Sequence, residues 1–335
     1  MEQSRSASRV PAVDILRGAV MVLMALDHVR DFVTNLRFQP ENLARGTAAL
    51  FASRWVTHFC APVFALVLWA LGFSMIVMAA LVHLPKGLVA AFALALIAGH
   101  NLFDGVRPAD WGAFAPLWNV LHVPGFAIPG RLLVAYPLIP WAGVMALGYV
   151  VADVYQGEPA RRRRVLIGAG VAATVLFVAL RTLNAYGNPF PWTTQRTTGL
   201  TVASFLNVLK YPPSLQFLLM TLGPVLVALA LLERARGRVA GWLEVIGRVP
   251  LFFYVFYVVH IYLAHLAGMT IAFVQSGEMH RIPVVTDPGA VPPWFGVSLP
   301  GVYVAWAIVV LAMYPLCLWY GRLKQRRDDW WLGYS

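Results

Sequence analysis

The chain has few charged residues for its length. Only 12% of its 335 residues are Asp, Glu, Lys or Arg, while 59% are hydrophobic; ordinary soluble domains carry about 25% charged residues. A globule of this size cannot hide so much apolar surface from water, so the composition predicts a protein of the lipid bilayer. The net charge of +11 sits in short clusters between apolar runs, which is typical of orientation charges and argues against nucleic-acid binding.

Other absences narrow the chemistry. The two cysteines, Cys60 and Cys317, lie inside apolar runs, so they imply no disulfide framework. The chain has no Gly-rich phosphate loop, no Gly-x-Ser-x-Gly elbow and no Walker motif, which argues against a nucleotide-driven pump. It also lacks the His-Glu-x-x-His spacing of a helical zinc site, so we expect no metal. The polar N-terminus is not followed by a small-residue cleavage site, so we expect no cleaved signal peptide.

Long apolar runs predict an all-α, polytopic transmembrane helical bundle of about eight spans, since a helix needs ~20 residues to cross the hydrocarbon core. The predicted spans are 13–34, 55–82, 88–103, 133–152, 164–183, 214–232, 249–275 and 300–320. Three shorter apolar pieces, broken by proline or polar residues, are predicted to be re-entrant or interfacial: 113–128, 199–209 and 290–299. We find no internal repeat and no long linker, and therefore expect residues 1–335 to form a single membrane domain.

The basic clusters predict the orientation. They are Arg161 to Arg164 after the fourth span, Arg234, Arg236 and Arg238 after the sixth, and Arg322, Lys324, Arg326 and Arg327 after the eighth. With eight spans and a cytoplasmic N-terminus, all three clusters fall on the same side, in agreement with the positive-inside rule. Residues 1–11 and 321–335 are then cytoplasmic tails of a multi-pass protein.

The first predicted span is rich in ionisable residues, which are costly inside a membrane and therefore indicate function. They are Asp14, Arg17, Asp27, His28, Arg30 and Asp31. Steps of three and four residues place Asp14, Arg17, His28 and Asp31 on one helical face. Asp31 lies one turn beyond His28, so we expect its carboxylate to accept a hydrogen bond from the ring and fix the tautomer. The alternative for Arg30 and Asp31 is a polar helix end at the headgroups.

The predicted topology gathers several polar side chains near the extracytoplasmic boundary. They are His28, His58, His100, Asn101, Asp104, His122 and His265, with His260 nearer the middle of its span. Taken singly, His122 is also explained as a loop residue and His260 as a hydrogen-bond partner of a neighbouring helix. Only His83, beside Lys86, is placed on the inner side, where it is interpreted as a solvated loop residue.

Several strings resemble a known family. An arginine, ten residues and a histidine (Arg17 to His28) resemble the signature of transmembrane acyltransferases. Longer strings are similar to bacterial members of the heparan-alpha-glucosaminide N-acetyltransferase catalytic-domain family: Leu-Asp-His-Val-Arg-Asp-Phe (26–32), Thr-His-Phe-Cys-Ala-Pro-Val-Phe (57–64), Leu-Ile-Ala-Gly-His-Asn-Leu-Phe-Asp-Gly (96–105), Tyr-Pro-Leu-Ile-Pro-Trp (136–141) and Phe-Leu-Asn-Val-Leu-Lys-Tyr-Pro-Pro-Ser-Leu (205–215). The chain departs from the family pattern after Phe64, which runs almost directly into Trp69-Ala-Leu-Gly72, where the resemblance implies a further membrane passage.

The resemblance implies acyl transfer across the bacterial inner membrane. The donor would be cytoplasmic acetyl-CoA or another acyl-CoA, used as a substrate rather than a resident cofactor, and the acceptor an extracytoplasmic amine or hydroxyl, often on a sugar. His28 is the position that matches the family's expected catalytic histidine. A homodimer is left open, and nucleic acid is not an expected partner.

These arguments assign roles to individual residues. His28 is the predicted general base, or the nucleophile of an acetyl-histidine route. Asp27 or Asp31 would orient it, and His58 and Arg54 would stabilise the oxyanion. The predicted substrate contacts are Arg17, Arg54, His100, Asn101, Asp104, His260 and His265. Arg248, Lys86 and the Arg161 to Arg164 run would meet the donor phosphates. The alternatives are a transporter or flippase that uses the His/Asp cluster as a proton relay, and a non-catalytic membrane relative of the acyltransferases.

Overall fold

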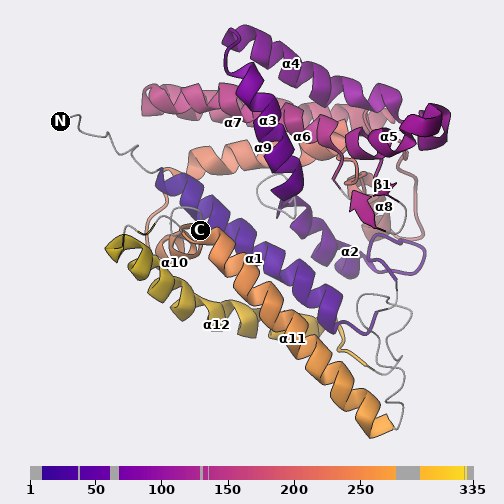
Figure 1. Cartoon of the computed structure of the whole chain (residues 1–335), viewed down its shortest axis with the longest axis vertical. Coiled ribbons are helices and arrows are strands. Elements are labelled where there is room, and N and C mark those ends of the chain that lie inside the picture. Colours follow the sequence, from indigo (N-terminus) through magenta and orange to yellow (C-terminus); the bar gives the residue numbers. More distant parts are fainter. Residues whose placement is uncertain are drawn as a thin grey trace. The chain divides into compact units, whose positions relative to one another are not determined.

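The computed structural model describes residues 10–36, 38–60, 68–128, 131–134, 136–276, 295–327 and 329. Helices account for almost all of the regular structure in these ranges (Figure 1), which confirms the all-α prediction. The chain forms two compact units: unit 1 comprises Met1–Cys60 with Leu231–Ser335, and unit 2 comprises Ala61–Ala230. The expectation of a single domain stays a prediction.

In unit 1, helix α1 contacts α10, α11 and α12. The helices are α1 (Pro11–Val33), α2 (Ala48–Trp55), the 3₁₀ helix η1 (Val56–Cys60), α10 (Arg238–Gly247), α11 (Pro250–Ser276) and α12 (Leu299–Arg326). Pro11 begins α1 at a position where its missing N–H costs nothing, and Asp14 and Arg30 lie in the first and last turns, where their charges suit the helix dipole. The end of α1 is held by a parallel bridge between Thr34 and Val297.

The closest packing in unit 1 is between α1 and α10. A Cβ atom on Gly18 would lie 1.9 Å from the backbone oxygen of Leu243, and one on Gly247 would lie 1.8 Å from that of Asp14. Glycine at both positions therefore lets the two backbones touch, as small residues do between membrane helices.

In unit 2, α3 and α4 pack on α6, around buried Met78, Leu81, Val89, Ala93 and Ala146. A two-stranded antiparallel hairpin, β1 with β2, follows α5. The elements are α3 (Leu68–Leu81), α4 (Lys86–Gly99), η2 (His100–Phe103), η3 (Pro108–Phe114), α5 (Ala115–Leu121), β1 (Gly125–Ile128), β2 (Leu132–Val134), α6 (Leu138–Val151), η4 (Ala152–Gln156), α7 (Pro159–Leu183), α8 (Thr198–Leu206) and α9 (Leu215–Leu232).

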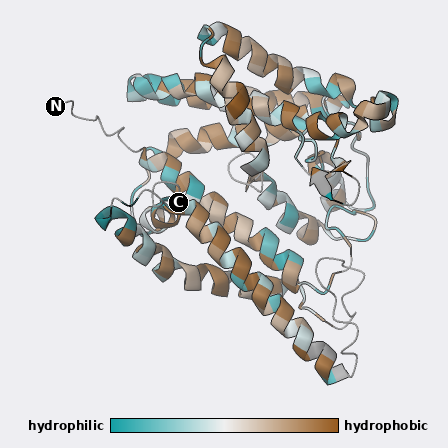
Figure 2. Cartoon of the chain, viewed as in Figure 1, coloured by the Kyte–Doolittle hydropathy of each residue, from teal (hydrophilic) through white to brown (hydrophobic). Residues whose placement is uncertain are grey.

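Six helical segments of the described chain are long and apolar enough to cross a membrane, and each corresponds to a predicted span. They are Lys86–Phe103, Leu138–Gln156, Pro159–Leu183, Leu215–Leu232, Pro250–Ile271 and Leu299–Arg326. Figure 2 shows hydrophobic residues along α7 and α12, with hydrophilic residues at the arginine-rich start of α7 and at the end of α12. Large apolar side chains such as Val175 (61% exposed) and Leu311 (66% exposed) face outward, as expected of helices surrounded by lipid.

The other two predicted spans differ from the rest. The span 13–34 is one helix, α1, but its charged residues set it apart from the apolar segments. The span 55–82 is not one continuous α-helix, because α2 ends at Trp55 and the 3₁₀ helix η1 follows it. Residues 61–67, which include Phe64 and the departure from the family pattern, lie outside the described residues. Residues 68–81 form α3, of which Trp69–Leu81 is a short apolar helix.

The predicted interfacial pieces contain short elements. Residues 113–128 hold the end of η3, α5 and β1, and 199–209 correspond mainly to α8. Of 290–299, residues 290–294 lie outside the described residues.

Candidate functional site

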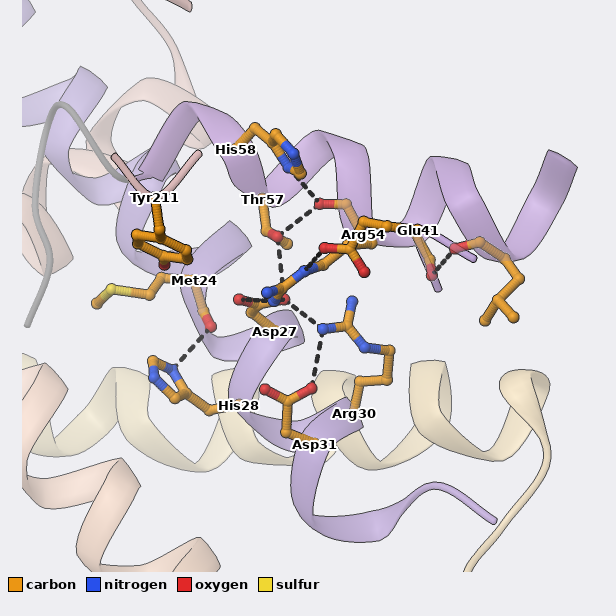
Figure 3. A network of polar contacts seen from close by, with 12 residues as sticks. Met24, Asp27, His28, Arg30, Asp31, Glu41, Arg54, Thr57, His58 and Tyr211 are labelled. Atoms are coloured by element: carbon orange, nitrogen blue, oxygen red, sulfur yellow. Dashed lines mark hydrogen bonds and ion pairs between the residues drawn. The ribbon is translucent and has the colours of Figure 1, made fainter. Parts of the chain in front are cut away.

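A network of charged side chains in unit 1 is centred on Asp27 of α1 (Figure 3). Its carboxylate binds the guanidinium of Arg54 from α2 through both oxygens, and Oδ1 accepts further hydrogen bonds from Arg30 (2.5 Å) and Thr57 (3.0 Å). Arg30 also donates to Asp31 at 2.9 Å. The side chain of Arg30 is only 2% exposed and that of Asp27 16%. Two cations thus share one largely buried anion, a geometry that neutralises charge inside the fold.

Glu41, in the loop before α2, completes the network. Its Oε1 accepts a hydrogen bond from Arg54 Nε at 2.7 Å. Burial alone would raise the pKa of Glu41, but the Arg54 guanidinium outweighs burial and lowers it. Burial would likewise lower the pKa of Arg54, but Asp27 and Glu41 raise it, so the guanidinium stays charged.

The ring of His28 lies beside this network and is held by other groups. Its Nδ1 is 3.1 Å from the carbonyl oxygen of Met24 and 2.9 Å from the hydroxyl of Tyr257 on α11. Tyr254 packs edge-on against the ring, with centroids 5.8 Å apart. When Nδ1 carries the proton and donates it to the Met24 carbonyl, the lone pair lies on Nε2, the atom that a general base would use.

The predicted orienting role of Asp31 is therefore not what the geometry favours. Nδ1 of His28 is engaged by Tyr257 and Met24, whereas the carboxylate of Asp31, 54% exposed, pairs with Arg30. One turn of helix brings the Met24 carbonyl to the ring, and α11 supplies a hydroxyl that no spacing within α1 can reveal.

His58 lies on η1, near the same network. Its Nδ1 is 3.1 Å from the carbonyl oxygen of Arg54, and its side chain is 1% exposed. Thr57 donates to the same carbonyl at 2.7 Å as well as to Asp27. The turn after α2 thus places the side chains of Thr57 and His58 beside Arg54, which itself binds Asp27.

The other predicted residues of unit 1 are placed at different points. Arg17, 48% exposed in its side chain, lies 3.7 Å from Asp14. His265 Nδ1 is 2.6 Å from the Phe32 carbonyl oxygen, so it lies one turn beyond His28 along α1. His260 is exposed, and its ring stacks on Phe256.

In unit 2, His100, Asn101 and Asp104 lie together at the end of the α4–η2 segment. Asn101 Nδ2 donates to Asp104 Oδ2 at 2.8 Å, and His122 of the α5 end brings Nε2 to 3.5 Å from Asp104 Oδ1. His122, for which the sequence also allowed an isolated loop residue, is therefore part of this group. The helical pattern of residues 115–121 was the one available signal, because it carries the chain back toward η2.

The two cations predicted to meet the donor phosphates already have carboxylate partners. Lys86 of unit 2 pairs with Asp153 and lies over the Tyr149 ring, and Arg248 of unit 1 pairs with Glu244 at 2.5 Å. Both cations are at least 40% exposed, and exposed pairs of this kind are weak.

Comparison with protein families gives a match inside unit 2. Residues 62–186 match the model of one family: heparan-alpha-glucosaminide N-acetyltransferase, catalytic. The match confirms the resemblance over this part of the chain. It includes Lys86, His100, Asn101 and Asp104, whereas the network around Asp27 and His28 lies before it. No curated protein matches the chain, and no solved structure does.

Sequence reasoning missed Tyr257 and Glu41, which contact the residues around His28 and Asp27, and it also missed the buried Arg181 of unit 2. Arg181 of α7 is 2% exposed and donates to the carbonyl oxygens of Ser204, Phe205, Asn207 and Phe190 at 2.8–2.9 Å. It thereby binds the C-terminal end of α8, where a cation is favourable. An arginine at the end of an apolar run was the signal, but its partners are backbone groups, which leave no mark in the sequence.

Proposed function

We propose that this chain is a membrane acyltransferase that moves an acyl group, in the simplest case acetyl, from cytoplasmic acyl-CoA to an amine or hydroxyl outside the bacterial inner membrane. The acceptor class is a sugar or glycan. The family matched by residues 62–186, described as an N-acetyltransferase, supports the reaction type. The observation that carries the assignment of the site is the His28 ring, whose Nδ1 lies 2.9 Å from the Tyr257 hydroxyl beside a buried charged network.

The reaction needs one proton to move twice. His28 Nε2 takes the proton of the acceptor amine or hydroxyl as that group attacks the thioester carbonyl carbon. The tetrahedral intermediate then collapses, the C–S bond breaks, and the imidazolium returns the proton to the departing thiolate of coenzyme A. Acyl transfer first to His28 and then to the acceptor has the same overall balance.

The surrounding groups have supporting roles in this proposal. Tyr257 and the Met24 carbonyl fix the ring and its tautomer, and a nearby fixed anion, Asp27, stabilises the imidazolium. Arg54 and His58 remain the candidates for the oxyanion, although Arg54 already carries two carboxylates. Stabilisation of the developing charge by donors held in place costs no reorganisation during the reaction.

The test is acyl transfer by purified protein in lipid nanodiscs. His28→Ala should lower turnover by ~10²-fold or more, which corresponds to ~2.7 kcal/mol of transition-state stabilisation. Tyr257→Phe should lower turnover less, because the ring loses the Tyr257 hydroxyl but keeps its contact with the Met24 carbonyl. His83→Ala, an exposed histidine in the turn after α3, is the matched control. Wild-type turnover in His28→Ala, with the control equally active, would refute the role.

A further inference from the structure

A second group of polar side chains, entirely within unit 2, has the composition of a metal site. His100, Asp104 and His122 each offer one ligand atom, and these atoms all lie within 4.8 Å of one another. His122 Nε2 and Asp104 Oδ1 are 3.5 Å apart. Two ligands on a tetrahedral zinc ion lie about 3.3 Å apart when each bond is ~2.0 Å long. The spacing of His122 Nε2 and Asp104 Oδ1 is therefore close to that of two ligands on one ion.

The burial of the His100 and His122 imidazoles indicates that their ring nitrogens bind a ligand. Both rings are only 1% exposed. Among the described residues, neither ring nitrogen of His100 nor Nδ1 of His122 has a hydrogen-bond partner. Each unsatisfied buried polar atom lowers the stability of the fold by ~1–3 kcal/mol. The two histidines, whose ring centroids are 5.7 Å apart, contain three such nitrogens. A cation that accepts one nitrogen from each ring removes much of this loss.

The carboxylate is already oriented for a ligand role. Asn101 Nδ2 donates to Asp104 Oδ2 at 2.8 Å, so Oδ1 is the oxygen that faces His122. The amide is itself fixed, because Asn101 Oδ1 accepts a hydrogen bond from the backbone N–H of Leu215 at 2.8 Å. Hydrogen bonds of this kind, which hold a metal ligand from behind, are a regular part of metal sites.

Aromatic rings enclose the group on the protein side. Trp118 lies 5.0 Å from the His122 ring, between centroids, and Phe103 lies 6.4 Å from it. Trp118 is 4% exposed, whereas the side chain of Asp104 is 21% exposed. The carboxylate is therefore the most accessible of the three ligand groups.

We propose that His100, His122 and Asp104 bind a divalent transition-metal ion, with Zn²⁺ the best match. Two neutral imidazole nitrogens and one carboxylate oxygen are ligands that zinc prefers. Three protein ligands leave the fourth tetrahedral position for water or a substrate atom. Bound there, the ion ties the end of the α4–η2 segment to the end of α5. The proposal does not depend on the role of His28.

The experiment measures metal in full-length protein purified through a tag that contains no histidine. After treatment with a chelator and exchange into metal-free detergent buffer, Zn²⁺ is titrated calorimetrically, and Co²⁺ is added separately as a spectroscopic probe. We expect one saturable site per chain and an intense Co²⁺ d–d band, the signature of tetrahedral coordination. His100→Ala and His122→Ala should each weaken Zn²⁺ binding at least ~100-fold, and Asn101→Ala ~10–100-fold.

The control and the failure outcomes are distinct. His83→Ala, which removes an exposed histidine outside the cluster, should leave binding unchanged. Zn²⁺ binding that is equal in His100→Ala, His122→Ala and wild type would show an adventitious ion only and overturn the proposal. Should the alanine variants not purify as monodisperse protein, the wild-type Co²⁺ spectrum decides: an octahedral or buffer-like spectrum at saturation overturns it, and a tetrahedral one supports it.

Discussion

At the scale of single residues, Asp27 balances two arginines that have little access to water. Arg30 is 2% and Arg54 12% exposed, and both contact the Asp27 carboxylate. Removal of one member of a buried ion pair leaves an uncompensated charge, which typically costs ~3–5 kcal/mol. The network therefore stabilises the arrangement of α1 with α2 as long as it is complete, and a single amide in place of the carboxylate breaks it.

We expect Asp27→Asn to lower the free energy of unfolding by ~3 kcal/mol or more. The matched variant Asp31→Asn should cost at most ~1 kcal/mol, because Asp31 is 54% exposed and exposed ion pairs contribute little. Unfolding of both purified variants, followed by circular dichroism at increasing denaturant, measures the difference. Equal stability of the two variants would mean that Asp27 does not carry the charge balance.

At the scale of helices, the contact between α1 and α10 depends on glycine. The Cβ positions of Gly18 and Gly247 would fall within 2 Å of backbone oxygens on the other helix, so no rotamer change can make room. A methyl group at either position must push the backbones apart, which moves α1 and the residues that it carries.

Gly18→Ala should therefore destabilise unit 1 and reduce activity, because Gly18 lies on the same helix, α1, as His28. Gly241→Ala is the control. Gly241 also lies on α10, and a Cβ atom there would have nothing within 4 Å. Alanine is the better helix former by ~1 kcal/mol, so the control should be neutral or slightly stabilised. Thermal unfolding of the two variants separates a packing clash from a general effect of glycine replacement, and similar melting temperatures would contradict the packing argument.

The sequence predicted helices better than it predicted contacts. Six of the predicted spans are long apolar helices in the structure, because the bilayer imposes length and hydropathy on a helix directly. The 3₁₀ turn at Val56–Cys60 was missed because it contains no glycine or proline that would mark a break in a helix. The pairing of Arg54 with Asp27, and of Tyr257 with His28, joins segments 27 and 229 residues apart. Such partners are chosen by tertiary packing, which one sequence does not display.

At the scale of the whole molecule, the basic clusters determine the expected orientation. If the six candidate spans cross the membrane in chain order, the arginine-rich start of α7, the residues after α9 and the end of α12 fall on one side. We expect a reporter fused after Ser335 to be cytoplasmic and reporters inserted near Gly112 or Asn188 to be outside. Paired phosphatase and fluorescent-protein fusions measure this, and an external C-terminus would overturn the topology and the side assigned to His28.

The donor follows from this orientation. Coenzyme A carries phosphates and a pantetheine arm about 20 Å long, from the usual projected length of its extended bonds. Its nucleotide must remain near cytoplasmic cations while the thioester reaches His28, most of the way across a core of about 30 Å. Lys86, Arg248 and the run Arg161 to Arg164 lie on that side in the expected topology. Lys86 and Arg248 are 46% and 40% exposed, and their partners Asp153 and Glu244 are 42% and 24% exposed. Because ion pairs at such exposed cations contribute at most about 1 kcal/mol, a phosphate can replace the carboxylates at a small cost.

We therefore expect acetyl-CoA to bind with micromolar-range affinity that weakens as salt rises, because exposed charges are screened. Lys86→Ala and Arg248→Ala should weaken binding, whereas Arg107→Ala, an exposed arginine paired with Asp110 and expected on the outer side, should not. Calorimetry with acetyl-CoA, coenzyme A and a thioether analogue provides the measurement. Absence of binding by all three to folded protein would mean that the chain lacks a donor site. The chain would then be better explained as a non-catalytic membrane relative of the acyltransferases. Binding without turnover would instead mean that the donor site is intact and that the catalytic role of the residues around His28 is wrong.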